Sequence, residues 1–415
     1  MLVIEHCSEM RNMLVTCRNY SIMNKISQVI KSGMCAGCGF CAASSKEMEI
    51  DNQGYFRPKS FIDDELSVRV CPGRRIAHNN NDGTYNLLWG PIVSCDVGYA
   101  NSQEVRHLGS SGGVLTALMC YLIDTNKVDA VIQIGVSDDN PIRNRTNIFS
   151  SREDIISCAG SRYSPSSPLT VIRSLLDNGK RYAIIGKPCD IAAMRTLVNH
   201  TPKYREQFPY LLSFMCAGIP SEKGTKQILR AWNLTPEQLI SFRYRGDGWP
   251  GLTKAITSAG EEFTMTYNES WGSILNRHLQ SRCKLCADGI GEAADIVCGD
   301  AWHASSNGYP SFEEEAGRSL TIARTQTGRQ LLDQALAAKA ITLTHYDIKE
   351  LKHIQPYQAN RKQTTQVRRW AVMLLGGKAP TYKGYHLGAL LLRSPIKLTV
   401  KAFCGTLIRK LRGRI

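Results

Sequence analysis

A short cysteine-rich run, Cys35–Cys41 (CAGCGFC), constrains this 415-residue chain more than any other stretch. Its C-x-x-C-x-x-C spacing lets one loop turn several thiolates toward a common point. Thiolates are soft ligands that suit iron–sulfur clusters and zinc, and the small residues between them fit a cluster wrapped closely by backbone. The run therefore predicts a metal or redox site near the N-terminus.

Such a site needs a fourth ligand. In bacterial ferredoxins the fourth cysteine of the run follows after three residues and is itself followed by proline. Here Ser45 occupies that position, and the Cys71-Pro72 pair comes later. The alternative is a zinc knuckle with the same ligands, but the spacing is more typical of a cluster. We predict one [4Fe–4S] cluster held by Cys35, Cys38, Cys41 and Cys71.

Fifteen cysteines are many for one chain, and the polar N-terminus lacks the apolar segment of a signal peptide. This combination indicates metal or redox chemistry in a reducing cytoplasm rather than a disulfide framework. No uninterrupted apolar stretch is long enough to predict a membrane span. A second Met at position 23 leads directly into the cysteine run, so we expect the functional module to begin there and Cys7 and Cys17 to be ordinary thiols.

The formal charge of +15 is concentrated at the C-terminus. From Lys352 to Ile415 there are fourteen Lys or Arg and no Asp or Glu, which leaves 37 basic and 36 acidic residues before it. A nearly neutral body argues against a specific nucleic-acid partner, and the basic segment suits an anionic surface. Around Leu387 and Ile396, apolar runs alternate with Lys and Arg, which is typical of segments that lie on an anionic membrane.

Alternating helical and apolar strand patterns predict an α/β (α+β) fold with a partly parallel sheet. We expect a hairpin over 46–58 and a linker over 79–90. Strands are expected over 128–136, 181–186 and 210–216, with helices after position 113, over 167–178, from Ile191 and near Ser221. Beyond Ser241 we expect β-hairpins, followed by a strand–helix–strand pattern from Asp295. The predicted parts are an N-terminal extension (1–22), a ferredoxin-like segment (23–78), an α/β domain (91–345) and a basic tail (346–415).

Several polar motifs are candidates for cofactor binding. Ser110–Gly113 (SSGG) opens a helix, where free backbone N–H groups and the helix dipole suit a phosphate, although Ser110 or Ser111 can equally serve only as the N-cap. Arg243 and Arg245 are expected on one face of a strand, binding phosphates or solvated. Trp302 follows a strand in Asp300-Ala-Trp, where it can stack on a flavin ring or belong to the core.

A second set of cysteines is scattered in sequence but sits where α/β folds place ligands. Cys189 and Cys216 follow predicted strands, and strand ends meet at one edge of a sheet. Cys283 and Cys286 form a C-x-x-C. Four thiolates gathered there would hold a second cluster. The alternatives are a redox disulfide at the C-x-x-C and, for each cysteine singly, a small buried apolar role.

Taken in order, these motifs resemble one family. C-x-x-C-x-x-C, SSGG, GSRY, GKPCD, MCAGIPS, YRGDGWPG, CKLC, ADIVCGDAW and GRSLTIARTQTG are similar to the coenzyme F420 hydrogenase/dehydrogenase beta-subunit family over roughly residues 24–345. That family includes beta subunits of archaeal F420-reducing hydrogenases, a plant 7-hydroxymethyl chlorophyll a reductase, and bacterial proteins from polysaccharide gene clusters. This chain departs from the family pattern in its distant fourth cysteine, Cys71, and in having Cys298 where a non-ligand residue is usual.

The resemblance implies FAD together with one or two [4Fe–4S] clusters. It maps the second cluster onto Cys189, Cys216, Cys283 and Cys286. It maps flavin contacts onto Ser110, Ser111, Gly112, Gly113, Ser161, Arg162, Tyr163, Lys187, Asp300 and Trp302.

The expected function is therefore an iron–sulfur flavoprotein oxidoreductase whose substrate the sequence does not name, with polysaccharide biosynthesis as the expected context. The expected electron donor is a ferredoxin or a reduced deazaflavin or flavin. The expected location is the cytoplasm, with peripheral contact at the inner face of the membrane. The alternative is a non-catalytic electron-transfer subunit or scaffold that serves a partner enzyme. A zinc-stabilised protein acting directly on glycans is disfavoured, because no carboxylate pair or nucleotide-sugar motif stands out.

Overall fold

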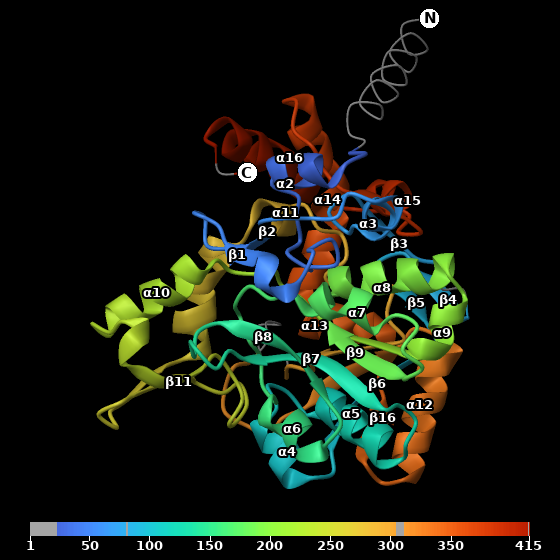
Figure 1. Ribbon diagram of the computed structural model, residues 1–415. Coiled ribbons are helices and arrows are strands. Elements are labelled where there is room, and N and C mark those ends of the chain that lie inside the picture. Colours follow the sequence, from blue (N-terminus) through green and yellow to red (C-terminus); the bar gives the residue numbers. More distant parts are fainter. Residues whose placement is uncertain (1–22, 80–81, 304–310, 414) are drawn as a thin grey trace, which may run out of the picture.

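The computed structural model describes residues 23–79, 82–303, 311–413 and 415. The predicted extension 1–22, with Cys7 and Cys17, lies outside the described residues. Among the described helices, none combines the length and the apolar character needed to cross a bilayer. Figure 1 shows the N-terminal and C-terminal segments together above a central sheet.

An eight-stranded mixed sheet forms the centre of the molecule, in the order β16-β6-β15-β14-β10-β9-β7-β8. The four strands β14, β10, β9 and β7 pair in parallel, and the flanking strands pair antiparallel. The predicted fold class is therefore confirmed. The strands are β6 (Ser94–Ala100), β7 (Ala130–Val136), β8 (Asn144–Phe149), β9 (Tyr182–Gly186), β10 (Tyr210–Phe214), β14 (Ile296–Asp300), β15 (Ser319–Ala323) and β16 (Ile341–His345).

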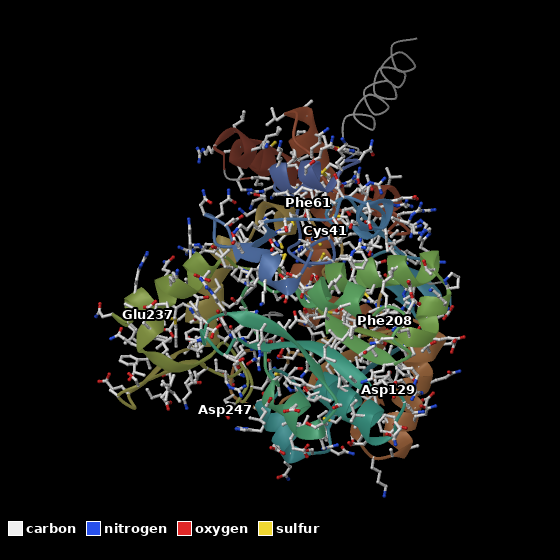
Figure 2. All side chains as sticks on the ribbon, in the orientation of Figure 1. Cys41, Phe61, Asp129, Phe208, Glu237 and Asp247 are labelled. Carbon is white, nitrogen blue, oxygen red and sulfur yellow. The ribbon has the colours of Figure 1, made fainter. Side chains whose placement is uncertain are left out.

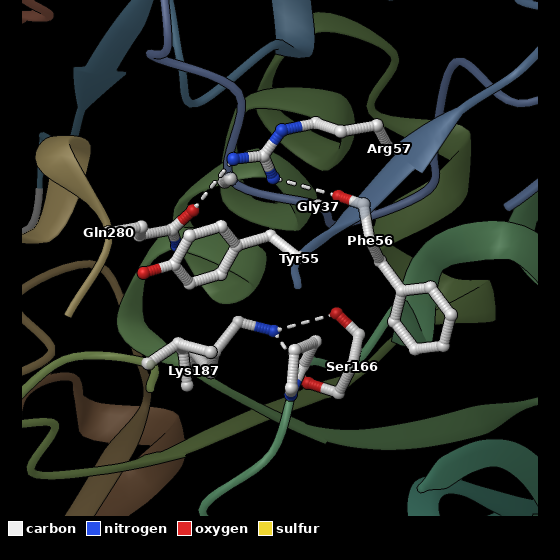
Figure 3. A pocket seen from close by; sticks show the side chains of 10 residues that line it. Gly37, Tyr55, Phe56, Arg57, Ser166, Lys187 and Gln280 are labelled. Carbon is white, nitrogen blue, oxygen red and sulfur yellow. Dashed lines mark hydrogen bonds between the residues drawn. The ribbon is translucent and has the colours of Figure 1, made fainter. Parts of the chain in front are cut away.

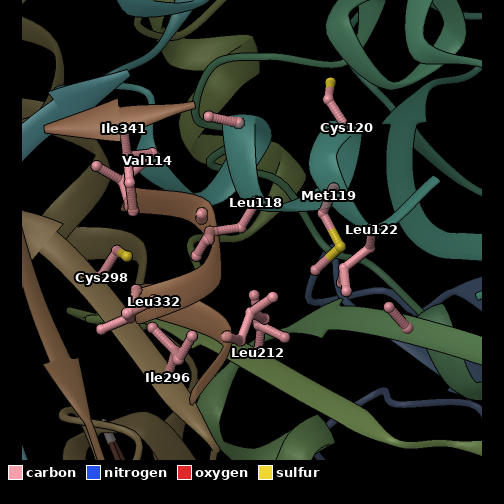
Figure 4. Close-up of a cluster of buried hydrophobic side chains, with 14 of the residues drawn as sticks. Val114, Leu118, Met119, Cys120, Leu122, Leu212, Ile296, Cys298, Leu332 and Ile341 are labelled. Atoms are coloured by element: carbon pink, nitrogen blue, oxygen red, sulfur yellow. The ribbon is translucent and has the colours of Figure 1, made fainter. Parts of the chain in front are cut away.

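Helices cover both faces of this sheet because its strands are apolar on both sides. Successive residues of β7 point to opposite faces of the sheet. Val131 packs against the helices on one face, and its neighbours Ala130 and Ile132 pack against α8 on the other face. Figure 4 shows the first core, where Cys298 is one of the buried side chains. The first face carries α4 (Gln103–Leu108), α5 (Val114–Asp124), α6 (Arg152–Ser157) and α12 (Gln326–Ala337), and the second carries η2 (Pro168–Val171), α7 (Ile172–Leu175), α8 (Pro188–His200) and α9 (Lys203–Gln207).

The N-terminal segment is a series of short elements on top of the sheet. The hairpin expected over 46–58 is confirmed by the antiparallel pair β1–β2. The linker expected over 79–90 is wrong in its second half, because β4 pairs with β5 as a hairpin closed by Asn86 side-chain hydrogen bonds. The elements are α2 (Ile26–Lys31), η1 (Ser45–Glu47), β1 (Met48–Ile50), β2 (Phe56–Pro58), α3 (Glu65–Val70), β3 (Arg75–Ala77), β4 (Thr84–Asn86) and β5 (Gly90–Ile92).

A side subdomain follows β10, and the expected hairpins form a three-stranded antiparallel sheet there. The helix expected near Ser221 is confirmed, with the Ser221 side chain capping it. The helix expected over 167–178 is instead a 3₁₀ turn followed directly by a short α-helix that ends at Leu175, because the backbone leaves helical geometry at Leu176 and is left-handed at Asp177. The subdomain contains α10 (Glu222–Ala231), η3 (Pro236–Gln238), β11 (Leu239–Arg243), β12 (Thr253–Thr257), β13 (Glu262–Met265), η4 (Asn268–Ile274), η5 (Leu275–His278) and α11 (Ser281–Lys284).

The basic C-terminal segment folds onto the molecule. Its long helix α14 is buried along most of its length and includes the buried cations Arg361 and Lys362. Residues from both ends of the chain share one apolar cluster, in which Val29 and Met34 meet Val372 and Ala379. The elements are η6 (Ile348–Glu350), α13 (Leu351–Ile354), α14 (Pro356–Leu374), β17 (Thr381–Lys383), α15 (Leu387–Leu392) and α16 (Ile396–Leu411).

Candidate functional site

The first cysteine set gathers on two neighbouring loops. Cys35, Cys38 and Cys41 follow α2, and Cys71 is the C-cap residue of α3. Burial raises the pKa of the Cys41 thiol, and the nearby Cys35 and Cys71 raise it further. Burial and Cys35 raise the pKa of Cys71 to about 11. The structure therefore brings the four predicted thiols into one electrostatically coupled group, and Figure 2 shows Cys41 above the sheet.

The loop geometry of this set suits a bound cluster. Gly37 and Gly39 both have left-handed backbone (φ +70° and +89°), which glycine adopts without strain and which folds the loop tightly. The Gly37 amide N–H points at the Cys35 sulfur, with 3.4 Å between nitrogen and sulfur. Hydrogen bonds to sulfur tune iron–sulfur clusters, so this arrangement fits the predicted ligand role.

The second cysteine set also converges, from three separate parts of the chain. Cys189 lies in the first turn of α8, Cys216 follows β10, Cys283 lies in α11 and Cys286 follows it. Burial, with Cys283 and Cys286 nearby, raises the pKa of Cys216 to about 12. Cys189 also interacts electrostatically with Cys216. The expectation that strand ends would bring these cysteines together agrees with this placement.

Two N–H groups point at one sulfur of this set. The Ile219 amide and the Gln280 side-chain amide each donate to Cys283 Sγ at 3.4 Å. Within the described ranges, no three His, Cys, Asp or Glu side chains are placed to share one metal ion. A [4Fe–4S] cluster makes a different demand, since each of its four thiolates binds a different iron. Three buried thiols and the half-buried Cys216, with two N–H donors aimed at Cys283 Sγ, fit that demand.

Two buried arginines that sequence reasoning missed surround the second set. Arg361 of α14 donates to the carbonyl oxygens of Cys216 and Cys283, each at 2.8 Å, and Thr365 donates to that of Cys286 at 3.2 Å. Burial works to lower the pKa of Arg361, but the cysteines, Cys286 first, hold it above its ordinary value. The helix α14 therefore holds the backbone of three of the four cysteines.

Arg282 connects the two sets. It donates to the carbonyl oxygen of Pro72, next to Cys71, at 2.8 Å, and it is 1% exposed. It interacts electrostatically with Cys71 on one side and with Cys189 and Cys286 on the other. One buried positive charge thus serves both groups of thiols. Its position directly before Cys283 in the sequence was the signal that could have identified it.

A small polar cavity of about 10 Å³ lies between the loop of the first cysteine set and residues that neighbour the second set in sequence. Figure 3 shows Lys187, Ser166, Tyr55, Arg57 and Gln280 around it. The Lys187 ammonium donates to Ser166 Oγ at 2.8 Å and pairs with Asp190 at 2.7 Å. It interacts electrostatically with Cys189 and Cys38, so it lies between the cysteine sets. Within the described residues, the Lys187 ammonium bonds Ser166 and Asp190 and none of the remaining predicted flavin contacts.

Four of those remaining contacts meet around Arg245. Its guanidinium donates to the Ser110 carbonyl at 2.6 Å, to both oxygens of Asp300 at 2.9 and 3.0 Å, and to the Tyr163 hydroxyl at 3.3 Å. It also lies over the Trp302 ring, 5.2 Å from the ring centroid. Motifs some 190 residues apart in sequence are thus brought to one place by a single 2%-exposed cation.

The glycines of SSGG pack tightly rather than forming an open cradle. Gly112 donates its N–H to Ser319 Oγ at 2.9 Å, and a Cβ there would lie 2.5 Å from the Gly98 carbonyl oxygen. Ser111 Oγ also bonds Ser319 Oγ. The N-cap of α5 is Gly113, with φ +74°, so the alternative that Ser110 or Ser111 caps this helix is wrong. Gly112 is needed for close approach of the chain to β6 and β15, and Gly113 for close approach to α4.

The other predicted contacts are engaged within the protein. Arg162 donates to Asn144 and to the carbonyls of Pro141, Arg143 and Phe242. Ser161 precedes it in the same turn. Trp249 stacks on Trp302, with centroids 4.8 Å apart and planes 9° apart, and donates to Asp300 at 2.8 Å. In this arrangement Trp249 and Arg245 cover the Trp302 ring, and the N–H groups of Arg245 already donate to protein acceptors. A flavin would have to displace these contacts.

Comparisons with known proteins identify the family. The N-terminal pattern of the coenzyme F420 hydrogenase/dehydrogenase beta subunit matches residues 96–173, and its C-terminal pattern matches residues 179–349. The chain is 24% identical over 354 residues to the coenzyme F420-dependent sulfite reductase of Methanocaldococcus jannaschii, covering 80% of this chain and 50% of that protein. The chain thus spans half the length of that relative.

Two further relatives point the same way. The coenzyme F420 hydrogenase beta subunit of Methanosarcina barkeri is 22% identical over 60% of this chain and 80% of that subunit. The chloroplastic 7-hydroxymethyl chlorophyll a reductase of Oryza sativa subsp. japonica is 21% identical over 56% of this chain and 48% of that protein.

A solved structure shares the fold. A chain of the F420-reducing [NiFe] hydrogenase complex from Methanosarcina barkeri superimposes with a TM-score of 0.55 and 19% identity, covering 72% of this chain and 98% of that chain. The family patterns together span more than half of the sequence and include the Arg245 site, Cys189, Cys216 and the C-x-x-C. The chain belongs to the coenzyme F420 hydrogenase/dehydrogenase beta-subunit family.

Proposed function

We propose that this protein is an iron–sulfur flavoprotein oxidoreductase that passes electrons between two [4Fe–4S] clusters and FAD. The observation that carries the proposal is the convergence of eight thiols, five of them buried, into two sets that share Arg282. The proposed ligands are Cys35, Cys38, Cys41 and Cys71 for one cluster and Cys189, Cys216, Cys283 and Cys286 for the other. The clusters would supply one-electron transfer.

FAD is the proposed second cofactor, on the strength of family membership. Its proposed contacts are the residues that meet around Arg245, together with Lys187. Since Trp249 covers Trp302 in this structure, flavin stacking on Trp302 requires Trp249 to move away. We further propose, following the family resemblance, that the reaction belongs to polysaccharide biosynthesis and that the donor is a ferredoxin or a reduced deazaflavin or flavin.

The second candidate is a non-catalytic electron-transfer subunit. Several relatives are named as subunits of hydrogenases or dehydrogenases, which favours a role beside a partner enzyme. The two candidates differ in whether the reduced protein alone passes electrons to a small molecule. Stopped-flow reoxidation with and without candidate partner proteins separates them.

We propose a cytoplasmic protein whose last helices touch the inner face of the membrane. Ile396, Val400 and Leu411 are 79%, 55% and 74% exposed and recur at helical spacing along α16, and Leu392 at the end of α15 is 89% exposed. Exposed basic residues, among them Lys397 and Lys401, flank this apolar stripe. Apolar side chains bordered by Lys and Arg suit the interface of an anionic bilayer.

We also propose the four-part division of the chain: 1–22, 23–78, 91–345 and 346–415. In this division α14 belongs to the last part but completes the second cysteine set.

Anaerobic purification followed by analysis of iron, sulfide and flavin tests the main proposal. Two [4Fe–4S] clusters and one flavin correspond to about eight iron, about eight sulfide and about one FAD per chain. Zinc without iron or flavin would overturn the proposal. Iron and sulfide without flavin would support the electron-transfer subunit instead.

A further inference from the structure

A hollow of about 510 Å³ opens beside the first cysteine set, and nothing in the proposed chemistry uses it. Its walls come from α3, the turn after Cys71, β3, the end of α8 and β17. In Figure 1, α3, β3 and α8 lie close together at one side of the molecule. We call it the basic pocket, because its charged lining residues are Arg69, Arg74, Arg75 and Lys383 with one carboxylate, Glu65.

Strand pairing explains why two of these cations face the hollow. β3 and β17 pair in parallel, with Arg75 opposite Thr381 and Ala77 opposite Lys383. Residues two apart in a strand share a face, so Arg75 and Lys383 lie on the same outer face of this two-stranded sheet. Ile76, on the opposite face, is fully buried. The fold thus buries the apolar side and presents both cations together.

The positive charge of the basic pocket is only partly compensated. Arg69 pairs with Glu65 at 2.5 Å, and Arg74 donates to the Met23 carbonyl at 2.8 Å. Across the described ranges, the side chains of Arg75 and Lys383 have neither a hydrogen-bond partner nor an ion-pair partner. Two uncommitted cations on one wall of a hollow attract an anion.

We propose that the basic pocket binds a small molecule that carries phosphate groups. The volume lies in the range of small-molecule sites, about 300–1,000 Å³. Arginine presents a planar fork that matches phosphate oxygens, and lysine adds a point charge. A concave site also favours a small ligand over the acidic face of a protein, which would meet only the rim.

The ligand would lie next to the first cysteine set. The backbone N–H groups of Arg74 and Arg75 both donate to the Cys71 carbonyl oxygen at 3.1 Å. A bound anion there adds negative charge beside the proposed cluster, which disfavours its reduction. This consequence rests on the proposed function, whereas binding itself does not.

Calorimetry with inorganic pyrophosphate and the full-length protein tests the proposal. We expect one binding site per chain, with affinity weakened at least tenfold by Arg75→Gln and by Lys383→Gln. Both side chains are exposed, so the variants should keep their fold, which circular dichroism checks. The matched control is Lys352→Gln, which removes an exposed cation on α13 and should leave the affinity unchanged.

Three results would overturn the proposal. They are no binding of pyrophosphate, an equal loss of affinity in the Lys352 control, and Arg75-dependent binding of an acidic ferredoxin by a protein that does not bind pyrophosphate. The last result would assign the surface to a protein partner. Because calorimetry does not require the clusters, failure here is distinguishable from failure of the iron and flavin analysis.

Discussion

Arg361 Nη1 lies 2.8 Å from the carbonyl oxygen of Cys216, although the two residues are 145 positions apart. The same guanidinium holds the Cys283 carbonyl at 2.8 Å, so one side chain joins the end of β10 to the C-x-x-C loop. The contact at Cys283 is buried, and the contact at Cys216 is partly buried. The position of the second cysteine set therefore depends on a residue that follows the family match.

Replacing Arg361 tests this dependence. We expect Arg361→Gln to lower the free energy of unfolding by about 2–4 kcal/mol, because two carbonyls lose charged donors. Iron bound by the second set should fall with it, while Arg361→Lys should keep part of both. Denaturant titration and iron analysis provide the measurements. The control is Arg369→Gln on the same helix, because the Arg369 guanidinium donates to the Pro380 carbonyl and not to a cysteine. Equal effects of both variants would contradict a specific role for Arg361.

Removing one proposed ligand should remove one cluster. We expect Cys38→Ser to lose about half of the bound iron, because a [4Fe–4S] cluster depends on four thiolates. Cys283→Ser should lose the other half, and the double variant should retain almost none. Iron analysis and low-temperature EPR of the reduced protein distinguish the two clusters. Cys404→Ser, at an exposed thiol, is the control and should keep all of the iron. Full iron content in both single variants would refute the ligand assignment.

Acid stability should depend on Glu292. Burial works to raise the pKa of Glu292, but Lys362 and His78 together lower it from an ordinary 4.5 to about 2. A pKa that is lower in the folded state adds stability above about pH 5, which is lost as the pH falls toward 2. Glu292→Gln should therefore flatten the dependence of unfolding free energy on pH across this window.

The same variant should be less stable at neutral pH, by about 3–5 kcal/mol, because it leaves the buried Lys362 ammonium without its carboxylate partner. Chemical denaturation from pH 2 to 7 measures both effects. Glu262→Gln, at an exposed position, should reproduce the parent profile. A parent-like profile for Glu292→Gln would show that this carboxylate is not the acid-sensitive group.

Substitutions at the stacked residues Trp249 and Trp302 are expected to change the affinity for FAD in opposite directions. If FAD stacks on Trp302, Trp249→Ala uncovers the ring and should raise the affinity for FAD several-fold, whereas Trp302→Ala should lower it. Flavin fluorescence quenching measures both affinities, with thermal melts to check folding. Equal losses of FAD in the two variants would show that the pair is part of the packed core and that the flavin binds elsewhere.

The apolar stripe on α16 predicts membrane binding. We expect the double change Ile396→Ser and Val400→Ser to weaken sedimentation with phosphatidylglycerol vesicles by about tenfold or more, because buried CH₂ groups contribute about 0.8 kcal/mol each. Vesicles of phosphatidylcholine should bind the parent weakly. Ile240→Ser, at a 66%-exposed apolar residue on β11, is the matched control. Unchanged sedimentation of the double variant would remove α16 from the membrane hypothesis.

Local patterns in the sequence were sufficient for the parallel strands β7, β9 and β10 and for the expectation that Cys189 and Cys216 lie at one edge of the sheet, but not for β6 and β8. Cys189 and Cys216 follow β9 and β10, which pair in parallel, so their ends must meet. The C-x-x-C at Cys283 joins them through the Pro220–Leu279 bridge. Hydrophobic period and cysteine spacing are properties of short segments and are visible in the residues themselves, whereas the strand order of the sheet depends on pairing between distant segments.

The partners of charged side chains were not visible in the same way. Composition counts Arg361 and Lys362 as part of a basic tail, but it cannot show that one holds two cysteine carbonyls and the other pairs with Glu292 at 2.7 Å. From the sequence, Arg245 was expected either to bind a phosphate or to be solvated. In the structure its guanidinium donates to Asp300 and to the Ser110 carbonyl. Each of these contacts joins distant segments, and its partner is set only when the chain has folded.

The position of α14 also bears on how the protein is made. Gln358, Arg361 and Thr365 hold the carbonyls around the second cysteine set, and all three follow the last cysteine of that set in the sequence. During synthesis the cysteine loops leave the ribosome well before the helix that fixes them. The second set can therefore reach its final geometry only after α14 has been synthesised, so any cluster bound earlier lacks the side chains that hold these carbonyls.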